Sequence, residues 1–228
     1  MTFPTTLPTV LGTVITPAGL RRLARKTLPA DAVEIRVDAF LAQKVPVEKI
    51  EAALKTRKHP VLLTLRIPAE GGRRAWKPAE RRALALRLLP HAEAIDIELA
   101  SARALAPVIA EARRTGKTVI LSAHAIKRPA TAAQIARWTA QFDPRPRTIL
   151  KIATQIKSWR DLQQLAALLV NHPDWPLAVM GLGPHAAQSR HVLAALGSRL
   201  LYGYLDRPAA PGQPSATEVK KMAGKVSL

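Results

Sequence analysis

The stretch that decides the fold is TVILSAHAIKRPATAAQIARWTAQFDPRPRTILKIAT, residues 118–154. It begins and ends with short, β-rich apolar runs, residues 118–125 and 148–154. Between them, residues 132–142 (AAQIARWTAQF) repeat apolar side chains with helical spacing. A strand, a helix and a second strand in this order predict two parallel strands joined by a helical crossover.

The same pattern recurs along the whole chain of 228 residues. Eight strand-like runs alternate with helical segments, which predicts an α/β protein with a closed (β/α)8 TIM barrel as a single domain over residues 1–228. An open doubly wound sheet is the alternative, but Gly12 and Gly19 do not match the glycine-rich phosphate loop that usually follows its first strand. The eight runs are residues 9–16, 32–38, 61–66, 94–100, 118–125, 148–154, 176–183 and 199–205.

Local signals predict where several helices begin and end. Ser101 and Ser158 suit helix N-caps, and Pro78 suits the first turn of a helix. Gly116 suits a helix C-terminus before the next strand. The proline-rich segment RPAAPGQPS, residues 207–215, predicts a loop after the eighth strand.

Composition narrows the class of protein. The chain has no cysteine, which excludes disulfides and thiolate metal sites. No apolar run reaches the roughly 18–20 residues that span a membrane, and the N-terminus lacks the basic-then-apolar order of a signal peptide. We therefore expect a soluble cytoplasmic protein without a membrane partner.

The net charge of +19 admits three interpretations: nucleic-acid binding, an acidic substrate, or a solvated basic surface. Most basic clusters fall at helical positions that should face water, which favours a solvated surface. Aromatic residues make up only 4% of the chain, so stacking platforms for bases are not supported and a nucleic-acid partner is not expected.

Ionisable residues interrupt the apolar runs towards the ends at which barrel enzymes carry their chemistry. Burying so many charges is costly unless they pair or act, so the set predicts an active site. Glu34, Arg36 and Asp38 alternate along the second run and should share one face. The other members are Arg66 in the third run, Asp96 and Glu98 in the fourth, His124 in the fifth and Lys151 in the sixth.

Lys151 is flanked by apolar residues, and desolvation together with nearby arginines favours the neutral amine that Schiff-base chemistry needs. His124 lies on the neighbouring strand, and neighbouring strands are about 4.8 Å apart, so the two side chains can meet over one substrate. A histidine near its ordinary pKa can take up and release protons at neutral pH. Without HxH, HExxH or GxSxG spacing, neither a metal nor a serine-hydrolase site is expected. The residues alone leave open another Schiff-base barrel enzyme, such as an aldolase, or a basic binding protein.

Seven motifs, in this order along nearly the whole chain, resemble those of the type I 3-dehydroquinate dehydratases. A barrel pattern that carries all seven makes the resemblance specific, although each motif alone is modest. The motifs are EIRVD (34–38), TLRIPAEGG (64–72), IDIEL (95–99), LSAHA (121–125), LKIAT (150–154), MGLGPHAAQSR (180–190) and APGQ (210–213).

The resemblance implies dehydration of 3-dehydroquinate to 3-dehydroshikimate in the shikimate pathway of aromatic amino acid biosynthesis, without a cofactor. The sequence does not distinguish this role from quinate breakdown, and a homodimer is a separate expectation. The resemblance also implies a role for each matching residue. Lys151 would form the imine and His124 would act as general acid and base, with Glu70 orienting His124. Arg190 and Gln213 would hold the substrate carboxylate, and Glu34, Arg36 and Arg66 would engage ring hydroxyls and fix neighbouring charges.

The chain departs from the family pattern at three positions. Ala209 stands where the family commonly has a serine, so one hydrogen bond to the substrate carboxylate is expected to be missing. Ala125 and Ile126 follow His124 where the family often has a polar residue and phenylalanine, which changes the predicted pocket wall. Ser215 lies two residues past Gln213, so it is not expected to replace the missing serine.

Overall fold

The structure is a computed structural model, which describes residues 1–4, 7–210 and 212–224. Residues 225–228 of the predicted domain and Pro211 of the predicted loop lie outside the described residues. Eight strands occupy the eight predicted runs. They are β1 (Thr9–Val14), β2 (Ala32–Arg36), β3 (Val61–Thr64), β4 (Ala94–Glu98), β5 (Thr118–Ala125), β6 (Thr148–Gln155), β7 (Leu177–Leu182) and β8 (Leu200–Tyr204).

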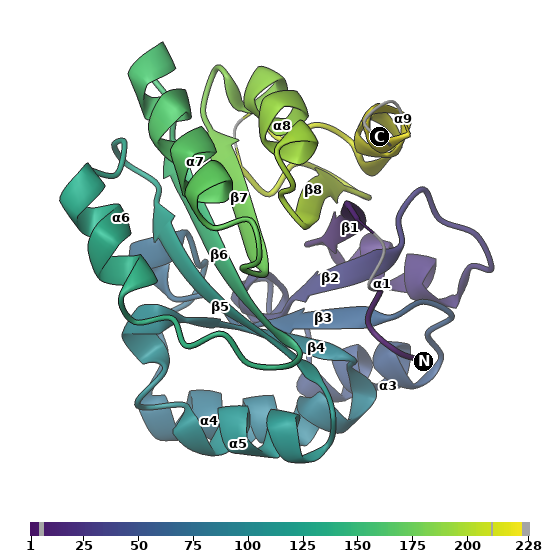
Figure 1. Cartoon of the computed structure of the whole chain (residues 1–228). Helices are drawn as coiled ribbons and strands as arrows, with labels where there is room; N and C mark the ends of the chain where they lie inside the picture. The colour runs from purple at the N-terminus through teal and green to yellow at the C-terminus, as the bar shows by residue number, and fades with distance from the viewer. Residues whose placement is uncertain (5–6, 211, 225–228) are drawn as a thin grey trace.

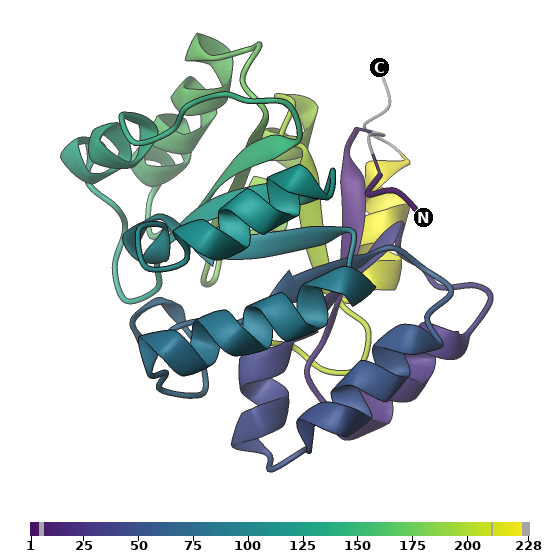
Figure 2. The same ribbon diagram turned by 90° about the horizontal axis from the view of Figure 1, so that it is seen from below.

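Helices follow the strands and lie outside them (Figures 1 and 2). The α-helices are α1 (Pro17–Leu20), α2 (Val37–Ala42), α3 (Val47–Lys55), α4 (Pro78–Leu88), α5 (Ala106–Arg114), α6 (Ala132–Thr139), α7 (Trp159–Asn171), α8 (Ala186–Ala195) and α9 (Ala216–Ala223). Short 3-10 turns are η1 (Arg21–Ala24), η2 (Pro68–Glu70), η3 (Leu89–His91) and η4 (Leu99–Ser101).

The strands form a parallel barrel in the order β7-β6-β5-β4-β3-β2-β1-β8. The seam between β7 and β8 is joined where these strands begin, by a backbone bond of 2.8 Å from Arg199 N to Leu177 O. Beside it, the Ser198 hydroxyl accepts from Val179 N at 2.9 Å and donates to Val179 O at 3.0 Å. The predicted (β/α)8 barrel is confirmed, and the open-sheet alternative is wrong.

Most of the predicted helix ends are confirmed. Ser158 caps α7 and forms a capping box with Asp161, and Pro78 opens α4. Gly116 follows α5 with a φ of 68°, in the left-handed region that suits glycine. The N-cap prediction for Ser101 is wrong: this residue ends η4, its hydroxyl accepts from Arg81 Nη1 at 2.8 Å, and α5 begins five residues later.

Two apolar layers hold the barrel together. The outer layer packs the strands against the helices, for example Val33 and Leu63 with Leu54 and Leu88. The inner layer fills the barrel with side chains such as Leu11, Leu62, Ile120 and Tyr202. Towards the ends of the strands, the interior becomes polar, with buried Glu34, Asp96 and Lys151. The barrel interior is therefore apolar along most of the strands and charged near their C-terminal ends.

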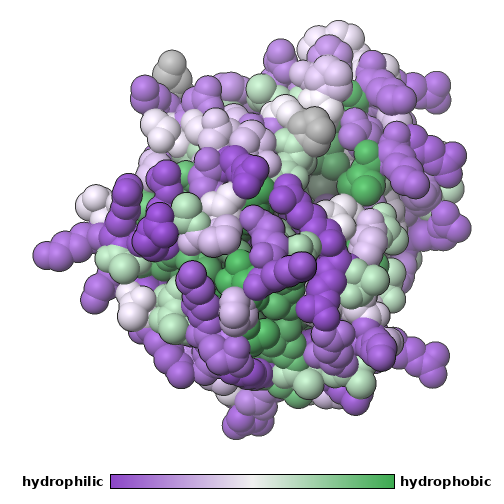
Figure 3. Space-filling model, turned by 180° about the vertical axis from the view of Figure 1, so that it is seen from behind, coloured by the Kyte–Doolittle hydropathy of each residue, from purple (hydrophilic) through white to green (hydrophobic). Residues whose placement is uncertain are grey.

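The basic surface is largely solvated. Arg21, Arg25 and Lys26 of the RRLARK cluster are exposed, as are Arg113 and Arg114 of EARRTGK. On the face in Figure 3, hydrophilic side chains predominate and surround a central group of hydrophobic ones.

Candidate active site

All eight residues to which the family resemblance assigns a role line one pocket at the C-terminal ends of the strands. Its volume is about 320 Å³, enough for a small substrate. The strands, the loop after β3, α8 and the loop after β8 each contribute side chains, which explains why residues so distant in sequence meet. The eight are Glu34, Arg36, Arg66, Glu70, His124, Lys151, Arg190 and Gln213.

Lys151 lies on β6 with only 4% of its surface exposed. Its ammonium donates to Asp96 Oδ2 at 3.0 Å and lies 4.1 Å from the centre of the Tyr202 ring. The register pairs Lys151 with Ser122 of β5, and His124 follows two residues later on the same face of that strand. The amine and the imidazole therefore open into the same pocket from adjacent strands.

Asp96 is the counterion of this buried cluster. Its Oδ2 also pairs with Arg66 Nη2 at 2.9 Å, and its Oδ1 accepts from the Ser122 hydroxyl at 2.6 Å. Burial alone would raise the pKa of Asp96, but Arg66 and Lys151 outweigh it and hold the pKa well below its ordinary value. Asp96 is therefore ionised throughout the neutral range.

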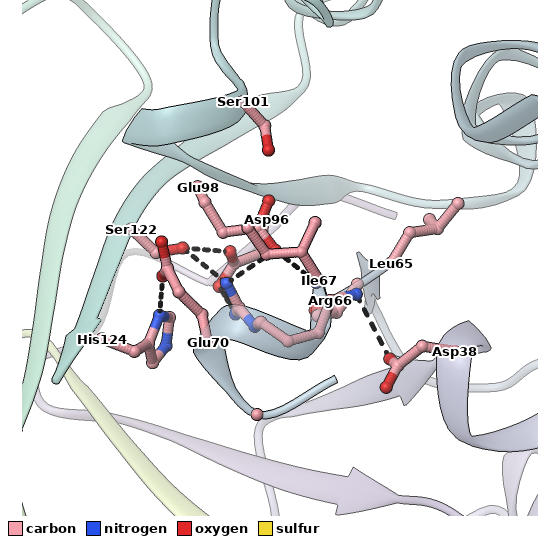
Figure 4. Close-up of polar contacts among 12 residues, drawn as sticks. Asp38, Leu65, Arg66, Ile67, Glu70, Asp96, Glu98, Ser101, Ser122 and His124 are labelled. Atoms are coloured by element: carbon pink, nitrogen blue, oxygen red, sulfur yellow. Dashed lines mark hydrogen bonds and ion pairs between the residues drawn. The ribbon is translucent and has the colours of Figure 1, made fainter. Parts of the chain in front are cut away.

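Arg66 crosses the floor of the site, and its Nη2 pairs with Asp96 (Figure 4). In addition to Asp96, its Nη1 bonds the Ser122 hydroxyl at 2.8 Å and lies 3.3 Å from Glu98 Oε1. Glu98 also pairs with buried Arg81. The charges predicted on β4 are thus neutralised in pairs, as burial requires.

His124 and Glu70 face each other across the pocket wall (Figure 4), with Nδ1 and Oε2 2.7 Å apart. Burial raises the pKa of Glu70 to about 7. Burial, Arg66 and Lys151 hold the pKa of His124 well below its ordinary value. The sequence-based expectation of a histidine near its ordinary pKa is therefore wrong, because it took no account of this desolvation and of the two cations.

The two glycines after Glu70 shape the loop that carries it. Gly71 has a φ of 89°, and its carbonyl accepts from Arg36 Nη2 at 3.1 Å. A Cβ on Gly72 would lie 2.1 Å from Arg66 O, so only glycine fits there. The EGG motif therefore has a steric reason: it folds the loop back so that Glu70 reaches His124.

The predicted position of Asp38 on the second strand is wrong. Strand β2 ends at Arg36, so Asp38 lies on α2 instead of alternating along the strand. Its fully buried carboxylate binds Arg36 Nε at 2.9 Å and Nη2 at 2.8 Å, and accepts from Arg73 N at 3.0 Å and Arg66 N at 3.3 Å. It joins β2 to the loop after β3 and orients the Arg36 guanidinium beside the pocket.

Arg190 is a pocket cation to which the described residues offer no ion pair. It projects from α8 and only 4% of its surface is exposed. Within the described part of the chain, its buried Nε and Nη1 have no hydrogen-bond partner. Burial lowers the pKa of Arg190 to about 10, so the group remains a cation at neutral pH. An unpaired buried guanidinium that lines a pocket is suited to an anionic ligand.

The loop after β8 completes the pocket. Gln213 Oε1 accepts from Ala209 N at 2.7 Å, which leaves its amide nitrogen 3.4 Å from the Thr13 hydroxyl. Ser215 caps α9 and its hydroxyl donates to Glu218 Oε2 at 2.7 Å, so it does not replace the serine missing at Ala209.

Glu34 is held by two hydroxyls: Thr13 donates to Oε2 and Thr64 to Oε1, each at 2.9 Å. Several lining residues were given no role in the sequence analysis, among them Thr13, Gln155 and Tyr202. Strand alternation could have identified Tyr202, which lies two residues after Leu200 on β8. Across the described residues, no group of three His, Asp or Glu side chains is placed to hold a metal ion.

Comparisons with known proteins identify the family of this chain. Residues 14–225 match the model of the family described as type I 3-dehydroquinase. The 3-dehydroquinate dehydratase of Methanosarcina acetivorans is 31% identical, with 85% of this chain and 84% of that protein covered. The enzyme of Thermodesulfovibrio yellowstonii is 29% identical, with 81% and 80% covered.

The fold is similar to a solved structure of 3-dehydroquinate dehydratase from Geobacillus kaustophilus, with a TM-score of 0.82, 23% identity, and coverage of 97% of this chain and 91% of that one. The family match spans nearly the whole chain and includes all seven motifs quoted above, while most of β1 precedes it. The chain therefore belongs to the type I 3-dehydroquinase family of hydro-lyases and dehydrates 3-dehydroquinate in the shikimate pathway.

Proposed function

We propose that this chain dehydrates 3-dehydroquinate through a Schiff base on Lys151, with His124 as the general acid and base. The observation that carries the proposal is the placement of the amine and the imidazole on adjacent strands, open to one pocket. Lys151 attacks the ketone carbon as the neutral amine. In net terms, the ammonium and the ketone give a protonated imine and one molecule of water.

The protonated imine withdraws electrons from the neighbouring carbon and acidifies its C2 proton. His124 is neutral because its pKa is depressed, and the ionised form of Glu70 accepts from Nδ1–H, which leaves Nε2 as the base. Nε2 takes the C2 proton to give an enamine, then returns a proton to the hydroxyl that leaves as water. Hydrolysis of the conjugated imine releases 3-dehydroshikimate and restores Lys151.

Binding of the substrate relies on its carboxylate. Arg190 is a pocket cation without an ion pair among the described residues and can grip a carboxylate with two donors. Gln213 adds an amide donor, since its oxygen is already occupied by Ala209 N. Glu34 and Arg36 face the pocket and engage the ring hydroxyls, whereas Arg66 fixes the charge of Asp96.

The test is reductive trapping. Borohydride added with 3-dehydroquinate should inactivate the enzyme and leave one reduced adduct on Lys151, located by peptide mass spectrometry. His124→Ala should still form the adduct, while its turnover falls by at least the roughly 10²–10⁴-fold that an acid–base group contributes. Lys127→Ala, which changes an exposed lysine on the loop after β5, is the matched control and should be trapped normally.

An adduct on another lysine, together with full activity in Lys151→Ala, would show that the nucleophile is assigned wrongly. If His124→Ala turns over at nearly the rate of the parent protein, His124 does not carry the proton transfers.

A cytoplasmic location and a homodimer are part of the same proposal. No helix in the described ranges is long and apolar enough to cross a membrane. Exposed apolar side chains on α7 and α8, namely Trp159, Val192 and Leu196 at its end, offer a surface for self-association. Light scattering coupled to size-exclusion chromatography decides between a monomer of 24.8 kDa and a dimer.

A further inference from the structure

A second pocket opens at the other end of the barrel, where the strands begin. Its volume is about 660 Å³. Arg147 directly precedes β6, Pro176 directly precedes β7 and Arg199 directly precedes β8, and all three line this pocket. Neighbouring strands are about 4.8 Å apart, so the two arginines start roughly 10 Å from each other on either side of β7. Their long side chains can reach one ligand between them.

The pocket is lined by cations without matching carboxylates. Its arginines are Arg145, Arg147 and Arg199, and no Asp or Glu occurs among its described lining residues. Arg145 is paired through Nε with Asp143 Oδ2 at 2.6 Å. Among the residues that the structure describes, Arg147 and Arg199 have no side-chain hydrogen bond or ion pair; Arg147 is exposed and Arg199 is half-buried. Two cations that line one pocket without a carboxylate between them favour a bound anion.

Thr148 supplies an independent indication of a ligand. It lines the same pocket with only 1% of its surface exposed, and its buried Oγ1 has no hydrogen-bond partner in the described ranges. A buried hydroxyl left unpaired costs free energy that a bound acceptor oxygen would recover. The preceding residue, Arg147, has a φ of 56°, an uncommon backbone conformation for a residue with a Cβ.

We propose that this end of the barrel is a binding site for a phosphoryl group, separate from the pocket of Lys151. Guanidinium groups and a hydroxyl that approach from different segments suit a tetrahedral oxyanion better than a planar carboxylate. The apolar wall of Phe3, Ile149 and Leu200 leaves room for an uncharged part of the ligand. The inference does not depend on the residue roles proposed for the dehydration.

The experiment is isothermal titration calorimetry of the full chain with inorganic pyrophosphate, at an ionic strength kept constant with KCl. The parent protein should bind it, and Arg147→Gln with Arg199→Gln should weaken binding roughly tenfold or more, since each removes a charge-assisted hydrogen bond. Thr148→Val keeps the shape of the side chain and should weaken binding severalfold. Dehydration of 3-dehydroquinate should be unchanged in both the double arginine variant and Thr148→Val, which reports that they are folded.

Two control variants separate this site from other cationic surfaces. Arg103→Gln with Arg113→Gln removes the same charge from exposed positions and should leave pyrophosphate binding unchanged. Arg190→Gln alters the other pocket and should also leave it unchanged.

The proposal is overturned if the parent protein binds no pyrophosphate, if the Arg103 and Arg113 control loses as much affinity, or if Arg190→Gln abolishes binding. Citrate binding more tightly than pyrophosphate at the same site would overturn the assignment to a phosphoryl group. If the double arginine variant does not fold, unchanged affinity in Thr148→Val would by itself count against the site.

Discussion

At the scale of single residues, the pair of Glu70 and His124 sets the protonation state of the site. The pKa of Glu70 is raised to about 7 and that of His124 lies well below its ordinary value. Ionised Glu70 accepts from Nδ1–H and leaves Nε2 free to take a proton. Protonated Glu70 donates to Nδ1 instead, and the proton on Nε2 then blocks its action as a base.

We therefore expect kcat/KM to fall as the pH is lowered through about 7, because the active form requires ionised Glu70, which exists above its pKa. In Glu70→Gln, the amide oxygen still accepts from Nδ1–H but does not titrate. This limb of the pH profile should disappear, with a loss of rate smaller than the roughly 10²–10⁴-fold contribution of a complete acid–base group. An acid limb that persists near pH 7 in Glu70→Gln would belong to another group.

Ala209 is the second residue-scale test. It lines the pocket beside Gln213, where the family commonly has a serine. Ala209→Ser should lower KM about tenfold if its hydroxyl reaches the substrate carboxylate, because a hydrogen bond to a charged group contributes about 1.5–3 kcal/mol. The change should leave kcat nearly constant if the bond is equally strong in the ground and transition states.

Steady-state kinetics with 3-dehydroquinate measure both constants. Arg190→Ala should be far more damaging, and adding Ala209→Ser should not restore it. A higher KM in Ala209→Ser, or no change, would mean that this position does not face the carboxylate.

At the scale of structural elements, the loop after β3 positions the acid–base pair. It is fixed through its backbone, with Ile67 N donating to Glu98 Oε1 at 3.0 Å and Trp76 Nε1 donating to Arg66 O at 3.0 Å. Asp38 binds it at both ends, through Arg66 N and Arg73 N. The geometry of Glu70 thus depends on the fold of the whole loop.

Gly72→Ala tests this dependence. Its Cβ would lie 2.1 Å from Arg66 O, so the loop must shift and carry Glu70 away from His124. We expect kcat to fall at least tenfold, since the orienting bond of the base is lost, together with a lower Tm.

The matched control is Gly197→Ala, where φ is 96° and nothing lies within 4 Å of the added Cβ. Backbone strain there should lower stability by about 1 kcal/mol and leave kcat unchanged. Thermal unfolding and kcat are measured on both variants. A normal kcat in Gly72→Ala would show that the loop has more freedom than its contacts suggest.

At the scale of the whole molecule, the net charge of +19 should draw in the anionic substrate. Raising KCl from low to high concentration should therefore increase KM severalfold, because salt screens long-range attraction over about 10 Å at 0.1 M. The value of kcat should change little, since Asp96, Arg66 and Lys151 are buried and poorly screened. A KM that is independent of salt would mean that the basic exterior does not assist substrate capture.

The sequence alone determined the elements and the chemical inventory of this protein. Strand and helix periods are local patterns, so β5, β6 and their intervening helix could be identified within short windows. The charged pocket residues at the strand ends could also be named, because the barrel brings the ends of all strands to one rim. Glu70, Arg190 and Gln213 do not lie on strands and were expected from the family resemblance.

Only the tertiary structure decided how these residues pair and how they titrate. Asp96 meets Lys151 across 55 positions of sequence. Glu70 meets His124 across 54 positions, a contact expected only from the family resemblance. No local pattern of sequence encodes such a long-range contact. Asp38 was expected on the strand because its spacing fits strand alternation, but its carboxylate binds the backbone of the loop after β3. The protonation of His124 was mispredicted for the same reason: desolvation and the field of Arg66 and Lys151 exist only once the chain has closed around them.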